Sequence, residues 1–181
     1  DITVGVSAQS SLYDAVTLQQ SKKRNIYNQM AQVLVGHDET GSVKLFDQDG
    51  VSDDSGTKLK DCIFINLSRL LIKDEIKKGT FSLEVGVGID PDTNQSIFND
   101  RILITDKSGS DGYFVNSPVG EYGILYATAS ATSNVARHLY DAVGSSGDYS
   151  SAYHLPIGHI YYQAGVVVLS ASLFTTGADG G

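Results

Sequence analysis

Short apolar runs, separated by glycine, serine and aspartate, recur along most of this chain. In the clearest example Phe81, Leu83, Val85 and Val87 alternate with smaller or polar residues. A period of two residues is typical of a strand with one buried face. Many such runs bounded by turn residues predict short strands joined by turns. We therefore expect a mainly β fold, either a sandwich or barrel-like.

Further strands are expected wherever a short apolar run lies between turn residues. These runs are residues 41–46, 62–67, 101–105, 112–116 and 121–127. Residues 69–78 mix aliphatic with charged side chains before Gly79, a pattern that fits either a short helix or an irregular turn.

Two apolar runs near the C-terminus predict a β-hairpin. Residues 159–162 and 166–174 flank a three-residue linker that ends in Gly165. Residues 166–169 show no alternation of apolar and polar positions. We expect this strand to be covered by the core on one face and by another element or subunit on the other.

One segment near the N-terminus, residues 21–35, has the spacing of an amphipathic helix. Ser21 can cap its start, and Gly36 supplies the left-handed residue that ends many helices. The side chains expected to face the core are Ile26, Met30, Val33 and Leu34.

The 181 residues suit one domain, since globular domains cluster at roughly 100 to 200 residues. We expect an N-terminal arm over residues 1–20, a single β-rich domain over residues 21–174 and a flexible tail over residues 175–181. The hydrophobic share of 41% is enough to fill one core.

Acidic residues outnumber basic ones by 21 to 13, which gives a formal net charge of −8. Phosphate binding draws on clusters of Lys and Arg, so the composition argues against a nucleic-acid partner. The longest apolar runs fall far short of the roughly 20 residues that span a bilayer, and we expect no membrane partner. The one basic run, Lys22, Lys23 and Arg24, indicates either an acidic partner or a solvated helix end.

Two carboxylate-rich segments offer the oxygen ligands that Ca²⁺ prefers. Residues 47–54 fail the EF-hand pattern, because Ser52 and Lys58 stand where that loop needs Gly and Glu. Residues 90–94 also fail this pattern, because Arg101 stands at the twelfth position counted from Asp90, where the loop needs Glu. We interpret both as polar turns and expect no metal and no cofactor.

Patterns for nucleophilic or acid–base catalysis are weak. His154 and His159 could supply two zinc ligands, but a structural site needs four, so we expect them at a turn or hairpin edge. Cys62 lies in an apolar run and is expected to be a buried, unreactive thiol. Residues 54–56 lack the apolar flank of an aspartic-protease loop, and no nucleophile elbow or phosphate-binding glycine loop is present. These failures predict a protein that is not an enzyme. The alternative that stays open is a hydrolase whose site is assembled only in the fold.

The ten tyrosines suit either a protein interface or stacking on sugars. In the interface interpretation, which we favour, the candidate residues are Lys22, Lys23, Arg24, Ile160, Tyr161, Tyr162, Val166 and Val168. The alternative is a carbohydrate-binding β module, with Ca²⁺ held in the acidic loop. Its stacking platforms would be Tyr161 with Tyr162, or Tyr149 with Tyr153.

Residues 22–31, residues 64–69 with 78–83, and residues 159–166 together suggest a family. They resemble segments of virion structural proteins of marine tailed bacteriophages, of the cyanophage type. The resemblance implies a tail, baseplate or fibre-attachment component, located in the virion in many symmetric copies. Its partners would be other virion proteins and copies of itself, and no catalytic residue is implied. We expect assembly by β-augmentation, in which residues 160–174 and the flexible chain ends add strands to neighbouring subunits.

Overall fold

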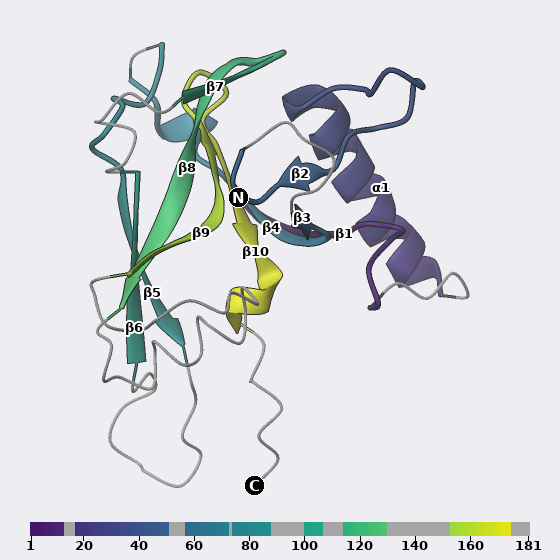
Figure 1. Ribbon diagram of the computed structural model, residues 1–181, viewed down its shortest axis with the longest axis horizontal. Helices are drawn as coiled ribbons and strands as arrows, with labels where there is room; N and C mark the ends of the chain where they lie inside the picture. The colour runs from purple at the N-terminus through teal and green to yellow at the C-terminus, as the bar shows by residue number, and fades with distance from the viewer. Residues whose placement is uncertain are drawn as a thin grey trace, which may run out of the picture.

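The computed structural model describes residues 1–12, 17–50, 57–72, 74–87, 100–106, 114–129 and 153–174. Eight of the described strands form one antiparallel sheet that curls into a half-barrel, with a single described α-helix packed beside it (Figure 1). This confirms the mainly β fold with one helix near the N-terminus. Of the two forms expected, the sheet is closer to the barrel-like one.

The sheet is built in the spatial order β1 (Ile2–Val6), β4 (Asp61–Asn66), β10 (Val166–Ser170), β9 (Tyr153–Tyr161), β8 (Gly120–Ala129), β6 (Asp100–Thr105) and β5 (Ser82–Val87). A further strand, β7 (Phe114–Ser117), pairs with β8. The remaining elements are the ribbon of β2 (Phe46–Asp47) and β3 (Lys58–Leu59), the helix α1 (Leu18–Leu34), and the 3₁₀ helices η1 (Ser68–Leu70) and η3 (Ala171–Phe174).

Most predicted strands are present, because local alternation and turn residues define them. Residues 41–46 are the exception, since only Phe46 lies in a strand and Val43 forms an isolated bridge with His37. The hairpin of β9 and β10 is confirmed, although the end of its second run is η3 rather than strand. Residues 69–78 contain η1 followed by irregular turns.

The N-terminal residues differ from the expected arm over residues 1–20. Ile2–Val6 pair with β4 along their whole length, from Ile2 opposite Ile65 to Val6 opposite Asp61. The helix also begins earlier than expected, with Thr17 at its N-cap and Ser21 inside it. The first strand therefore belongs to the sheet. The tail predicted over residues 175–181 lies outside the described residues.

The helix buries a face shifted by one residue from the predicted one. Its buried side chains are Tyr27, Ala31 and Leu34, while Val33 is 59% exposed. Ile26 and Met30 are only partly buried beside this face. The predicted stop is confirmed, because Gly36 has a φ of 81° and its N–H donates to the Ala31 carbonyl at 3.0 Å.

Two cores lie on opposite faces of the sheet, and β10 contributes to both. Val166 and Val168 face the helix-side core, which also contains Tyr27, Phe46, Phe64 and Tyr161. On the other face, Val167 and Leu169 belong to the far-side core, with Ile104, Leu125, Ile160 and Tyr162. Every residue of β10 is buried, which confirms the strand expected to be covered on both faces, here by another element of the same chain.

The helix crosses the sheet directly above Gly5 of β1. A Cβ added to Gly5 would lie 2.7 Å from Phe64 Cε2 and 2.9 Å from the Tyr27 backbone nitrogen. Only glycine lets the helix backbone approach the strand this closely.

We expect Gly5→Val to lower the free energy of unfolding by about 1–3 kcal/mol, because the added methyl groups must displace α1 or the Phe64 ring. Chemical denaturation followed by circular dichroism measures the change. Thr3→Val, on the same face but exposed, is the matched control and should change little. Equal effects of the two substitutions would contradict the close approach of helix and strand.

Candidate functional site

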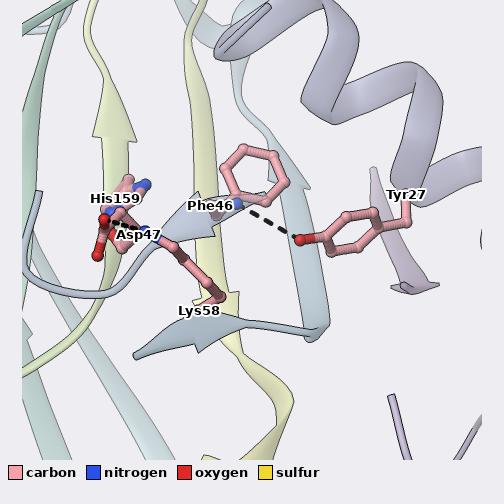
Figure 2. Close-up of polar contacts among 5 residues, drawn as sticks. All are labelled: Tyr27, Phe46, Asp47, Lys58 and His159. Carbon is pink, nitrogen blue, oxygen red and sulfur yellow. Dashed lines mark hydrogen bonds and ion pairs between the residues drawn. The ribbon is translucent and has the colours of Figure 1, made fainter. Parts of the chain in front are cut away.

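The β2–β3 ribbon lies between α1 and β9 and is tied to both by buried polar side chains. Figure 2 shows Tyr27 reaching the ribbon from the helix and His159 reaching it from the sheet. This polar cluster, made of Tyr27, Asp47, Lys58 and His159, is the strongest candidate site that the structure describes.

Tyr27 joins the helix to both strands of the ribbon. Its hydroxyl donates to the Leu59 carbonyl at 2.6 Å. It also accepts from the Phe46 backbone N–H at 3.4 Å (Figure 2). Its ring meets the Phe46 ring edge to face, with centroids 5.5 Å apart. Burial raises the pKa of Tyr27 far above its ordinary value, so the hydroxyl stays protonated and serves as a structural donor.

His159 is fully buried in the middle of β9, where it pairs with Val168 on one side and Ile124 on the other. The expectation of a turn or hairpin-edge histidine was therefore wrong for this residue. Its Nε2 bonds the Asp47 carbonyl, and the Tyr161 hydroxyl lies 3.4 Å from its Nδ1. The side chain of His154 lies outside the described set.

The protonation state of His159 follows from these contacts. Burial lowers its pKa to about 4, so the ring is neutral at pH 7. A carbonyl oxygen only accepts hydrogen bonds, so Nε2 carries the hydrogen and Nδ1 accepts from Tyr161. Both ring nitrogens therefore have hydrogen-bond partners within the chain.

Asp47 and Lys58 form a cross-strand ion pair on the ribbon. They are directly opposite in the register, and Lys58 Nζ lies 2.5 Å from Asp47 Oδ2. Burial raises the pKa of the Asp47 carboxyl, and Lys58 opposes this shift. The next residue, Gln48, donates from its side-chain nitrogen to the Pro156 carbonyl at 2.8 Å and ties the ribbon to β9 again.

A second buried polar group, Asp106, fixes the segment that precedes β5. One carboxylate oxygen accepts from the Phe81 N–H at 2.8 Å, and the other accepts from the Gly79 N–H at 2.8 Å and the Tyr162 hydroxyl at 3.0 Å. Outside this anchor, Lys78 pairs with Glu121 and lies 4.9 Å from the centre of the Phe114 ring. Asp106 was not among the residues expected from the sequence, although an aspartate directly after an apolar run was a visible signal.

Most of the predicted interface residues are not on the surface. Five of them have buried side chains within the two cores: Ile160, Tyr161, Tyr162, Val166 and Val168. Their prediction as contact residues is corrected, because apolar runs in a sheet covered on both faces are core rather than interface. Among the others, Lys22 is exposed, and Lys23 and Arg24 are partly exposed on α1.

The same burial bears on the sugar-binding alternative. Tyr161 and Tyr162 cannot stack on a sugar, since neither ring reaches the surface. Tyr149 and the side chain of Tyr153 lie outside the described residues, as do residues 54–56 and 90–94.

The structure also bears on the metal and thiol expectations. Within the described ranges, no three His, Cys, Asp or Glu side chains are grouped to hold a metal ion. Cys62 is buried, as predicted, and burial raises its pKa well above the ordinary value for a thiol.

A hollow of about 690 Å³ opens beside the turn between β9 and β10 and is lined by Asp74, Glu75, Lys77 and Gln163. Its described lining residues carry both charges and include no serine, cysteine or histidine. Among the described helices, none is both long and apolar enough to cross a membrane.

Comparisons with known proteins give no relative to guide the interpretation. No protein-family model matches the chain, and no curated protein or solved structure does so either. The functional argument therefore depends on the chain's own geometry.

His159 makes the stability of the protein depend on pH. Its folded pKa of about 4 lies below the unfolded value near 6.5, so the unfolded chain binds the proton first. We expect the folded state to lose about 3 kcal/mol as the pH falls from 6.5 to 4. The raised pKa of Asp47 acts in the opposite direction and reduces the net slope.

Denaturation at a series of pH values measures this dependence. His159→Gln, which cannot titrate, should flatten the slope between pH 6.5 and 4. His37→Gln, at an exposed position, is the control for the loss of a histidine. An unchanged slope in His159→Gln would show that the buried ring is not the titrating group.

For the second anchor, we expect Asp106→Asn to cost about 1–3 kcal/mol, because the amide nitrogen cannot accept the backbone N–H group it would face. Hydrogen exchange measured by NMR should show faster exchange at Gly79 or Phe81. Asp38→Asn is the control, since exposed Asp38 also accepts backbone N–H groups, from Thr40 and Ser42. Equal stability loss in both variants would contradict a special role for the buried carboxylate.

Proposed function

We propose that this chain is a structural protein of a tailed-phage virion, a tail, baseplate or fibre-attachment component that acts by binding neighbouring subunits. The observation that carries the proposal is the outer edge of β1. This strand ends the sheet, and within the described part of the chain it pairs only with β4. Its side chains Ile2 and Val4 are 70% and 40% exposed.

An exposed apolar edge strand is a binding surface in its own right. Its outward backbone groups can pair with any strand that adds to the sheet, and natural proteins protect such edges unless they use them. Lys or Pro on β1 would protect this edge, but its sequence is Ile2, Thr3, Val4, Gly5 and Val6. The unprotected edge of β1 therefore favours the addition of a strand from another protein chain.

The chemistry of the interior supports the same proposal. The histidine and the buried tyrosines that could serve in acid–base catalysis bond to the chain's own backbone and to each other. These contacts hold the ribbon and the helix against the sheet. A protein whose reactive groups are used in this way is suited to a mechanical role.

The expected partners are copies of this chain and other virion proteins. The sequence resemblance to tailed-phage virion proteins supports this choice, and the acidic composition argues against nucleic acid. Strand addition at β1 replaces the earlier expectation that the β9–β10 hairpin supplies the contact, because that hairpin lies inside the sheet.

The mass of the purified protein tests this function. Light scattering and negative-stain electron microscopy at increasing concentration should show a particle of many copies with a defined symmetry. A single-chain mass at every concentration would contradict a structural role in a virion.

A further inference from the structure

We propose that β1 pairs with β1 of a second copy of this chain, antiparallel and in a register centred on Thr3. The proposal rests on the function proposed above and names the partner and the register of its edge contact. Four features of the described residues select this arrangement: the direction of the backbone groups, the exposed side chains, the position of α1 and the nearby charges.

The hydrogen-bond pattern shows which backbone groups of β1 point outward. Asp1 and Asn66 exchange two hydrogen bonds, of 3.1 and 2.8 Å, and the Ser7 N–H donates to the Lys60 carbonyl at 2.7 Å. In an antiparallel pair such bonds recur at every second residue. The backbone groups of Thr3 therefore point toward β4, and those of Ile2 and Val4 point away from the sheet.

Exposure limits the register further. Residues 1–4 are exposed, whereas Gly5, Val6 and Ser7 are buried. An incoming strand can therefore bond only to Ile2 and Val4. A symmetric antiparallel partner meets this condition when Ile2 lies opposite Val4 of the second copy and Thr3 lies opposite Thr3. This register gives two pairs that each exchange two backbone hydrogen bonds.

The side chains agree with this register on both faces. Ile2 and Val4 lie on the face opposite α1, beside the partly buried Ile63 and Ile65 of β4. In the dimer, Ile2 of one copy lies beside Val4 of the other, so the row of aliphatic side chains continues from one sheet into the next. On the helix side, two Thr3 side chains meet, and aliphatic pairs and threonine pairs are both favourable across antiparallel strands.

The position of α1 distinguishes this register from its nearest competitor. The helix crosses β1 at Gly5, and its N-terminal half continues beyond the strand (Figure 1). With Thr3 at the centre, the two crossings lie about 14 Å apart along the strands at ~3.4 Å per residue. With Val4 at the centre they would lie about 7 Å apart, which is closer than the 8–10 Å of packed helices.

Local charge is also complementary. In this register Asp1 lies opposite Gly5 of the second copy, on the face where that copy's α1 passes. Lys23 and Arg24 precede Tyr27 by one helical turn, so they lie on the side of α1 that approaches this edge. In this register the Asp1 carboxylate lies on the side where the basic run of the second copy's α1 passes.

Disulfide trapping tests the register. Thr3→Cys places two thiols directly opposite each other, within the distance that a disulfide requires. Ile2→Cys is the matched control, because Ile2 is also exposed but lies two residues away from its own symmetry mate. The native Cys62 is buried and does not compete. Under mild oxidation, Thr3→Cys should form a covalent dimer at least ten times faster than Ile2→Cys.

Equal rates for the two variants, or no dimer from either, would overturn the proposal. A second comparison separates this result from a failure of the proposed function. Val4→Lys should halve the mass of the assembly that the wild-type protein forms, or dissociate it. Val33→Lys, the same substitution at an exposed position of α1, should leave that mass unchanged. If the wild-type protein forms large particles that Val4→Lys leaves intact, the β1 contact is wrong and the structural role stands. If the wild-type protein is a monomer, the structural role fails as well.

Discussion

The fold depends on burying both faces of β10. Val167 and Leu169 fill one core while Val166 and Val168 fill the other, so this strand can exist only when elements cover it from both sides. The curl of the sheet covers the far side, and α1 with the β2–β3 ribbon covers the helix side. An antiparallel sheet with one face exposed to solvent does not need a second layer of elements. The helix and ribbon are therefore required by the sequence of β10.

Buried polar groups then hold the less regular segments against this central strand. The ribbon has only two short strands and few apolar side chains, so apolar burial alone holds it weakly against the sheet. Tyr27 and His159 add hydrogen bonds that fix it in place. Asp106 does the same for the turn before β5. Each anchor satisfies backbone groups that would otherwise be buried without partners. This use of reactive side chains is the physical reason for proposing a structural role.

Local patterns predicted the parts of the fold that depend on local sequence. The alternation in residues 81–87 gave β5, and the uninterrupted apolar run gave a strand covered on both faces. The helix was located correctly, but its buried face was not, because Tyr27 was not weighed as a core residue. Tyrosine can be buried when its hydroxyl finds a partner, and that partner is Leu59, far along the chain.

The anchors themselves could not be predicted from the sequence. His159 bonds a residue 112 positions away, and Asp106 bonds residues 25, 27 and 56 positions away, so neither set of contacts leaves a local pattern. The strand β1 was missed for a different reason. Five residues with an internal glycine resemble an extended arm until the register with β4 is known.

We propose that the chain assembles at the outer edge of β1, where alternate residues point their backbone groups toward β4 and away from the sheet. Residue-resolved hydrogen exchange by NMR tests this most directly, at low and high protein concentration. The Thr3 and Gly5 amides, which face β4, should be protected at both concentrations. Those of Ile2 and Val4 should be open in the dilute protein and protected in the concentrated one. Rapid exchange at Ile2 and Val4 in the fully assembled protein would contradict the central claim.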